Sequence, residues 1–304
     1  MTTQPDAPPA TGCPSRGGPC PTAEQCVGAR SCLGEPSGRD RVDAVLRSLQ
    51  RMREQPARPH SLTELAQTAL LSPFYFHRVF RRVTATTPSR FLTALRMAEA
   101  KRLLTETPLN VTEICAEVGY SSLGTFTTQF TRHVGLSPSR YRHAVGALGH
   151  VSLRAVIERF EPPPGPAAVT GSVTGGPGHS ASAAVALFRS AIPQGQPVAG
   201  TVVPVPGRVE LPAVPDGDYH PLAMWLDERA SISRALREAG GPFGFVAASG
   251  VAGASVAVRR GRALAPFEIG LRPFQAVDPP IVYAAPLLLA LAVLGGDGRV
   301  VARP

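Results

Sequence analysis

The sequence predicts a multidomain α plus β protein, in which an all-α domain is followed by an all-β domain. Three observations support this order. Apolar side chains recur at helical spacing through residues 39–145, as on helices that turn one face to a core. The same segment contains an internal repeat. From residue 167 onwards, short Val- and Ala-rich runs are separated by Gly and Pro, which is typical of strands and turns.

The chain of 304 residues divides into four segments. Residues 1–38 are rich in Pro, Gly, Ser and Cys and lack apolar periodicity, so we predict a disordered, Cys-rich tail. Residues 39–145 form the helical domain. Residues 146–166 are predicted to be a linker, because the run EPPPG at 161–165 cannot continue a helix. Residues 167–304 form the β domain, which we predict to be a sandwich with a regulatory or interaction role.

The positive charge of the chain is concentrated in the helical domain. The net charge is +9, and residues 39–145 hold 16 Lys and Arg against 8 Asp and Glu. Such a basic segment is typical of domains that face nucleic-acid phosphates, although solvated helices can be equally basic. The sequence shows no secretory signal, and the apolar residues 281–294 are interrupted by Pro286 and fall short of the roughly 20 residues of a membrane helix. We therefore predict a cytoplasmic protein without membrane contact, in which residues 281–294 form a buried strand or short core helix.

The internal repeat shows which residues of the helical domain correspond to each other. Seven positions correspond at an offset of fifty, six with the same residue and one with Phe91 matched by Tyr141, and the run LTEL at 62–65 corresponds to VTEI at 111–114 with an offset of forty-nine. The first copy contains Ser72, Phe76, Phe80, Pro88, Ser89, Arg90 and Phe91. The second copy contains Ser122, Phe126, Phe130, Pro138, Ser139, Arg140 and Tyr141. Two copies of one pattern predict two similar units of structure.

Each copy opens with the signals of a helix start. Ser61 with Glu64, and Asn110 with Glu113, have the spacing of a capping box. A short helix is expected to follow each of them. A second helix then carries two aromatic side chains four residues apart, and therefore on one face.

The turns between these helices complete the pattern. The chain is predicted to break near residues 69–71 in the first copy and at Gly119 in the second, where glycine supplies the left-handed turn conformation. Thr87 and Ser137 each precede a proline, so each begins a further helix. The sequence therefore predicts two helix-turn-helix units, connected by a helix at 91–104.

The repeated segment resembles the DNA-binding domain of AraC/XylS-family transcriptional regulators over residues 62–142. Its second half is the more diagnostic, with VGY at 118–120, two phenylalanines four residues apart, and GLSPSRYR at 135–142. Ala85, where the family usually has glycine, and Cys115, where it usually has alanine, are departures. The resemblance implies a sequence-specific DNA-binding transcriptional regulator that inserts two recognition helices into successive major grooves. The implied partners are double-stranded DNA and RNA polymerase.

The resemblance also implies which side chains contact DNA. The base-reading positions are Phe74, His77, Arg78, Leu123, Gly124, Thr125 and Thr128. Arg78 can donate two hydrogen bonds to guanine, His77 can donate or accept one, and Phe74 suits a thymine methyl group. The positions on the second recognition helix are short or apolar, so we expect them to read DNA shape and methyl groups. One turn further along, Arg81, Arg82, Thr131 and Arg132 suit phosphates.

Four of the five cysteines lie in the N-terminal tail. They are Cys13, Cys20, Cys26 and Cys32, separated by six, five and five residues. Four thiolates could hold Zn²⁺ or an iron–sulfur cluster, although the spacing fits no standard zinc motif. The alternative function is therefore a metal- or redox-responsive regulator, or a DNA-repair-linked protein, that acts through these cysteines. An unfolded tail with reduced thiols also accounts for the cluster.

The β domain is predicted from eight short runs with strand character. They are residues 169–173, 184–188, 197–203, 209–211, 219–225, 243–248, 255–258 and 267–271, with a helical turn inserted at 233–239. Residues 207–225 resemble a signature of prealbumin-like, carboxypeptidase-regulatory-like β-sandwiches, in which Pro215 and Gly217 make a turn and the Tyr219 ring packs under it. The domain could bind an effector, dimerise or contact a partner, and the sequence favours none of these.

Catalysis is not predicted. His179 and His220 stand apart from Cys, Glu or Ser at any ligand or triad spacing. The sequence contains no phosphate-binding loop motif and no dinucleotide-binding fingerprint. We therefore expect the chain not to be an enzyme.

Overall fold

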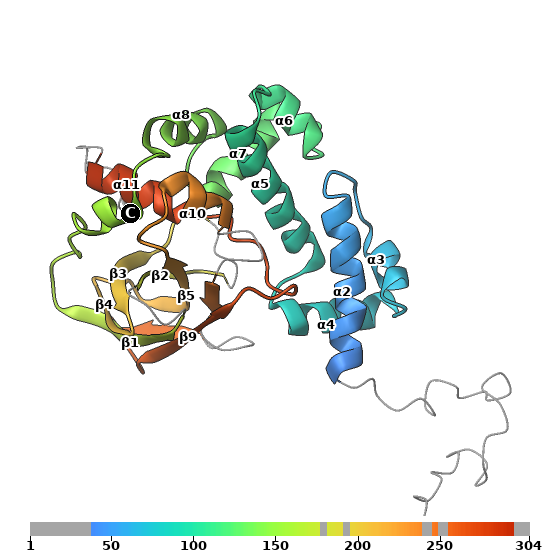
Figure 1. Ribbon diagram of the computed structural model, residues 1–304. Coiled ribbons are helices and arrows are strands. Elements are labelled where there is room, and N and C mark those ends of the chain that lie inside the picture. Colours follow the sequence, from blue (N-terminus) through green and yellow to red (C-terminus); the bar gives the residue numbers. More distant parts are fainter. Residues whose placement is uncertain (1–37, 177–180, 191–194, 239–244, 249–254, 295–304) are drawn as a thin grey trace, which may run out of the picture. The chain divides into compact units, whose positions relative to one another are not determined.

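The computed structural model describes residues 38–176, 181–190, 195–238, 245–248 and 255–294. By its contacts the chain divides into two units, Met1–Asp43 and Ala44–Pro304. The first unit contributes to the described residues only the beginning of α2 (Gly38–Glu54). The packing of the other helices and of the strands lies within the second unit, whose ribbon is drawn in Figure 1.

The regular elements of the described chain are all helices as far as residue 157. After α2 come α3 (Leu62–Thr68), α4 (Pro73–Thr84), α5 (Pro88–Glu106), α6 (Val111–Glu117), α7 (Leu123–Val134), α8 (Pro138–Leu148) and α9 (Leu153–Ile157). The pairs α3–α4 and α6–α7 each consist of a short helix, a tight turn and a longer helix, and α5 connects the two pairs (Figure 1). Two helix-turn-helix (HTH) units are therefore confirmed, and we call α3–α4 the first HTH and α6–α7 the second HTH.

The two HTH turns have the same backbone hydrogen bonds, although only one contains glycine. In the second HTH, Gly119 has a φ of 80° and two hydrogen bonds of 2.9 Å close the turn. In the first HTH, Leu70 has a φ of 59°, and two bonds of the same length join the equivalent positions. A Cβ on Gly119 would lie 2.1 Å from the Ala57 carbonyl oxygen, whereas the Leu70 side chain is 82% exposed. The predicted breaks, at 69–71 and at Gly119, are both confirmed, and Leu70 adopts a conformation that is costly for a residue with a side chain.

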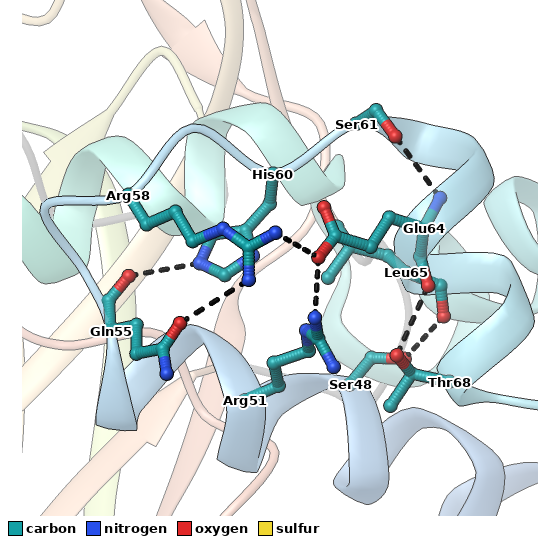
Figure 2. A network of polar contacts seen from close by, with 9 residues as sticks. All are labelled: Ser48, Arg51, Gln55, Arg58, His60, Ser61, Glu64, Leu65 and Thr68. Carbon is teal, nitrogen blue, oxygen red and sulfur yellow. Dashed lines mark hydrogen bonds and ion pairs between the residues drawn. The ribbon is translucent and has the colours of Figure 1, made fainter.

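The predicted capping boxes form completely in only one of the two HTHs. In the second HTH, the Asn110 side chain accepts from the Glu113 N–H at 2.9 Å, and the Glu113 carboxylate accepts from the Asn110 N–H at 2.7 Å. In the first HTH, Ser61 Oγ accepts from the Glu64 N–H at 3.1 Å. The Glu64 carboxylate, however, pairs with two arginines instead of the Ser61 backbone (Figure 2).

Glu64 lies at the centre of a polar network that joins α3 to α2 (Figure 2). Arg51 on α2 donates to its carboxylate, and Arg58, from the following loop, forms an ion pair of 3.0 Å with the same oxygen. Both arginines lower the pKa of the Glu64 carboxyl group, the hydrogen bond from Arg51 most strongly. Ser48 of α2 also donates to the Leu65 carbonyl at 2.8 Å. The first HTH is thus fixed to α2 by ion pairs and hydrogen bonds.

The helical region has two hydrophobic cores. The core of the first HTH combines α2, α3, α4 and the start of α5 through residues such as Leu49 and Phe76, with Val277 partly buried against it. The core of the second HTH combines α5–α9 with residues from the C-terminal part of the chain, among them Leu226 and Leu287. α5 contributes to both cores, and only the second core is largely shared with the C-terminal part.

The strands begin at residue 167. They are β1 (Ala167–Gly175), β2 (Ala181–Phe188), β3 (Ala199–Val205), β4 (Gly207–Pro212), β5 (Gly217–Leu226), β6 (Phe245–Ala248), β7 (Val256–Arg259), β8 (Arg262–Ala263) and β9 (Phe267–Pro273). Each of the eight predicted runs overlaps one of them, and β8 is a two-residue strand that pairs with β7. The predicted fold class, an α domain followed by a β domain, is confirmed.

The strands form one mixed sheet that curls back on itself. Its order is β3-β2-β5-β6-β9-β1-β4, so β3 and β4 lie at opposite ends, yet only Pro206 separates them in the chain. In a flat sheet with strands about 4.8 Å apart, these two ends would be roughly 29 Å from each other. One residue cannot span that distance. β9 joins the two parts of the sheet, since it pairs in parallel with β1 and antiparallel with β6.

The curled sheet has a core of its own, in which Tyr219 is fully buried. The Tyr219 hydroxyl donates to the Pro215 carbonyl at 3.0 Å, under the turn that contains Gly217. A Cβ on Gly217 would lie 2.8 Å from the Tyr219 hydroxyl oxygen, so glycine is required there. The predicted packing of Tyr219 under this turn is confirmed.

Three short helices outside the sheet share the core of the second HTH. They are α9, α10 (Ile232–Glu238) and α11 (Ala285–Leu294). α10 and α11 confirm the predicted helical turn and the predicted short core helix. α9 lies inside the segment 146–166, which the sequence predicts to be a linker, and its Leu153 and Val156 are fully buried. No helix in the described ranges is both long and apolar enough to cross a bilayer.

Candidate nucleic-acid interface

The recognition helix of the first HTH is α4, and its N-terminal half exposes one face. Phe74 is 82% exposed, Arg78 is exposed and His77 is half-buried. Positions 74, 77 and 78 share one side of a helix, while Phe76 and Phe80 are buried against the first core. The three base-reading positions predicted on this helix are therefore accessible to another molecule.

An aromatic ring, not a hydrogen bond, orients the Arg78 side chain. Its guanidinium carbon lies 5.1 Å from the centre of the Tyr75 ring, which is within the range of a cation–π contact. Among the described residues, Arg78 has no hydrogen-bond or ion-pair partner. Its five N–H donors thus remain available, while the ring restricts the side chain.

The recognition helix of the second HTH is α7, and its exposed face is less charged. Gly124, Thr125 and Thr128 are exposed, and Leu123 is 43% exposed. His133, further along the same helix, is buried, and burial lowers the pKa of its ring. Short, uncharged side chains allow another surface to approach the helix backbone closely, which is consistent with reading shape.

The residues predicted to contact phosphates differ in what they can still donate. Arg81, Arg82 and Arg132 are exposed near the C-terminal ends of the two recognition helices. Thr131 is exposed as well, but its hydroxyl donates to the Thr127 carbonyl at 2.8 Å. Because an ionised phosphate oxygen accepts hydrogen bonds, Thr131 would have to break this bond to contact one.

A cluster of three aromatic rings supports each recognition helix from its buried side. In the first HTH, the centre of the middle ring lies 5.5 Å and 5.8 Å from its two neighbours, and in the second both distances are 5.8 Å. The clusters are Phe76, Phe80 and Phe91, and Phe126, Phe130 and Tyr141. The residues that recur in the sequence therefore make the same contacts in the structure, and they place both recognition helices alike.

Two arginines that hold backbone segments were missed by the sequence analysis. Arg96, on α5, donates to the three carbonyls of residues 56–58 at 2.8, 3.1 and 3.2 Å. Arg142, on α8, donates to the carbonyls of Leu104 and Leu109 at 3.1 and 2.6 Å. Nothing in the sequence distinguishes an arginine that binds carbonyls from one that binds phosphates, because both tasks use the same donors.

Residues 65–144, which include most of both HTHs, match a family described as a helix-turn-helix domain. The two aromatic clusters, α5 and the whole second HTH lie within this match, and the first three residues of α3 precede it. This segment is an AraC-type helix-turn-helix domain.

The AraC-type domain is similar to segments of proteins named as transcriptional regulators. It is 40% identical over 85 residues to the HTH-type transcriptional regulator Rv1931c of Mycobacterium tuberculosis, covering 28% of this chain and 33% of that protein. It is 36% identical over 108 residues to the RCS-specific HTH-type transcriptional activator RclR of Escherichia coli, covering 36% and 37%. The chain thus spans about a third of the length of these relatives. A solved structure of the DNA-binding domain of AdpA with a target DNA shows 29% identity and a TM-score of 0.33, covering 34% of this chain and 94% of that one.

The two departures from the AraC pattern are accommodated locally. Ala85 ends α4 with a φ of 56°, where the second HTH has Gly135 with a φ of 95°. Cys115 is 4% exposed, its thiol donates to the Tyr120 carbonyl at 3.5 Å, and burial raises the pKa of the thiol. Ala85 therefore takes a conformation that favours glycine, and Cys115 behaves as a core residue.

The candidate metal ligands lie outside the described residues. They are Cys13, Cys20, Cys26 and Cys32, and His179 lies outside as well. Within the part of the chain that the structure describes, no group of three or more His, Cys, Asp or Glu side chains could hold a metal ion. His220 is half-buried on β5, and burial lowers the pKa of its ring.

Proposed function

We propose that this protein is a sequence-specific DNA-binding transcriptional regulator that inserts α4 and α7 into successive major grooves of one duplex. The observation that carries the proposal is the duplicated HTH, in which the same aromatic cluster fixes each recognition helix and leaves its opposite side accessible. A helix of this kind fits the major groove. Because both helices belong to one chain, the protein can read an asymmetric site without a two-fold partner.

The two recognition helices read DNA in different ways. On α4, Arg78 donates two hydrogen bonds to guanine, His77 makes one hydrogen bond and Phe74 contacts a thymine methyl group. The free donors of Arg78 and the exposure of Phe74 support these roles. On α7, the contacts are mainly to groove shape and methyl groups, through Leu123, Gly124, Thr125 and Thr128.

The phosphate contacts come from the ends of both helices. Arg81 and Arg82 on α4 and Arg132 on α7 neutralise phosphates, and their exposure supports this role. Thr131 can donate to a phosphate only if its hydroxyl gives up the hydrogen bond to the Thr127 carbonyl. Each arginine removed should reduce the slope of log affinity against log salt concentration by about 1.

The wider context of the proposal follows from the relatives. Proteins that share the AraC-type domain are named as transcriptional regulators or activators, so we infer that this chain acts in the cytoplasm together with RNA polymerase and without catalysis. The β domain then has a regulatory or interaction role.

A randomised-site selection with the full chain tests the proposal. We expect one preferred, asymmetric sequence that binds about 10³-fold or more tightly than random DNA. Arg78→Ala should cost about 1–3 kcal/mol and relax the preference at one base pair. Arg208→Ala, which removes an exposed arginine from β4, is the matched control and should change neither. A selection that returns no preferred sequence contradicts the proposal.

A further inference from the structure

A cavity of about 380 Å³ lies between α5 and the C-terminal part of the chain. Its walls come from the end of α2, from α5, from Tyr141 on α8, from the end of α10, and from Pro280 and Ile281. The volume is in the range of sites that hold small organic molecules. Because α5 connects the two HTHs, a ligand in this cavity would contact the helix that sets their relative position.

The wall formed by α5 contains Lys101, which is the only lysine in the chain. Lys101 is 5% exposed, and its ammonium donates to the carbonyls of Ile281 and Val282, both at 3.1 Å. An ammonium has three donors, so one donor remains. Among the described residues, no carboxylate forms an ion pair with Lys101, and burial lowers its pKa to about 8. A buried charge without a counter-charge is unfavourable and normally has a partner.

The other charged groups around the cavity leave the Lys101 charge uncompensated. Glu99 and Glu106 both pair with Arg102, at 2.7 and 2.9 Å. Arg53 donates to a backbone carbonyl, and Arg237 adds another positive charge at the end of α10. The cavity therefore has an excess of cations, and both carboxylates in its lining are already paired.

We propose that this cavity binds a small organic monoanion, namely a carboxylate with an apolar body, whose head group accepts the remaining hydrogen bond of Lys101. One negative charge matches the one buried ammonium. The apolar body lies against Leu95, Leu236 and Ile281, which line the same cavity. The ligand then bridges α5 and the segment at 280–282, and so links the C-terminal region to the position of the recognition helices. This regulatory role rests on the proposed function, whereas the binding of the carboxylate does not.

The single lysine permits a direct test on the full chain. Protein labelled with lysine that carries ¹³C at the ε position should give one side-chain resonance, which titrates with a pKa near 8. Benzoate and hexanoate are the probes, and benzamide and hexanamide are their neutral counterparts. We expect both carboxylates to shift the Lys101 resonance saturably and to raise its pKa, since a nearby negative charge favours the charged ammonium. The amides should do neither.

A pair of variants separates the site from general charge effects. Lys101→Met removes the charge at similar length and should weaken benzoate binding at least about tenfold in calorimetry. Arg208→Met, on the exposed side of β4, should leave benzoate binding unchanged. If Lys101→Met does not fold, the resonance of the unsubstituted chain still decides. A Lys101 that titrates near its ordinary pKa of 10.5 without ligand, or a resonance that neither carboxylate moves, overturns the proposal.

The effect of the carboxylate on DNA binding is a separate measurement, so the ligand site and the proposed function can be contradicted independently. Affinity for the selected DNA site, measured with and without benzoate, should change at least severalfold in the unsubstituted chain and not in Lys101→Met. Benzoate binding that leaves DNA affinity unchanged overturns the regulatory role alone. Benzoate binding in a chain that selects no DNA sequence supports the ligand site and overturns the proposed function.

Discussion

The two HTHs share one backbone plan, but different parts of the chain complete their cores. The first HTH buries its apolar side chains against α2 and the start of α5. The second shares its core with α9, α10, α11 and the residues just before α11. The first HTH is thus supported mainly by neighbouring helices, whereas the second depends on residues more than a hundred positions away. A repeat in sequence does not make two equal units in structure.

The two recognition helices differ in charge as well. α4 exposes Arg78, Arg81 and Arg82, whereas α7 exposes Arg132 and otherwise short or apolar side chains on its predicted DNA-contacting face. In the proposed complex, the first HTH therefore contributes most of the hydrogen bonds to DNA. The second HTH mainly reads the shape of the groove, and its core is shared with the C-terminal region.

The largest effect that tests this difference comes from removing one buried leucine from each core. Leu49 and Leu287 are both fully buried, in the first and second core respectively. Replacing either by alanine should cost about 2–5 kcal/mol in the free energy of unfolding. Hydrogen exchange should then show that Leu287→Ala weakens the protection of α7 more than that of α4, and that Leu49→Ala does the reverse. Equal losses in both helices would mean that the two HTHs open as one unit.

A smaller effect is expected at the link between the two HTHs. Arg96 binds the three carbonyls of residues 56–58, and its guanidinium lies 5.7 Å from the centre of the Tyr120 ring in the second HTH. Arg96→Ala leaves these carbonyls without their donor and should cost about 1–3 kcal/mol in denaturant unfolding. Arg90→Ala, an exposed position on the same helix, should cost less than about 0.5 kcal/mol. Similar costs for both variants would show that Arg96 does not stabilise the link between the two HTHs.

What could be predicted from the sequence is what depends on near neighbours in the chain. The HTH repeat, the breaks at 69–71 and Gly119, and the turn over Tyr219 follow from caps, spacing and turn residues. The predicted capping box gave the wrong partner for the Glu64 side chain. Its carboxylate pairs with Arg51 and Arg58, whereas a capping box would pair it with the backbone N–H of Ser61.

The rest depends on contacts between distant residues. Lys101 donates to the carbonyls of Ile281 and Val282, about 180 positions away. The spacing of residues along the sequence cannot predict a contact between positions so far apart. For the same reason the sequence could not show that α11 completes the core of the second HTH. The DNA contacts assigned to α4 and α7 stay predictions.

The buried Lys101 should also make the free energy of unfolding depend on pH. Burial lowers the pKa of Lys101 from 10.5 to about 8. Between pH 8 and 10.5 the unfolded chain therefore binds more protons at this site than the folded chain, so the contribution of Lys101 to stability rises with pH. The unfolding free energy of the unsubstituted chain, measured relative to Lys101→Met, should increase from pH 7.5 to pH 10. A constant difference would show that the ammonium is not buried.

The smallest effect concerns the turn of the first HTH. Leu70 adopts a left-handed φ at a cost of about 1–2 kcal/mol, and its side chain is largely exposed. Leu70→Gly should relieve this cost, less about 0.4–1 kcal/mol for the more flexible unfolded chain, and so raise the melting temperature slightly. Gly119→Ala, at the equivalent turn, should lower it strongly, because the new Cβ would meet the Ala57 carbonyl. A destabilised Leu70→Gly would show that the leucine side chain has a contact worth more than the strain.

The central claim is that α4 and α7 bind one face of a duplex together, although they differ in their support. Inserting about five base pairs, half a helical turn, between the two halves of the selected site turns one half to the opposite face. We predict that affinity for the altered site falls roughly 10³-fold, to that of random DNA. Affinity that survives the insertion would contradict the account, because the two helices would then not be reading DNA as a pair.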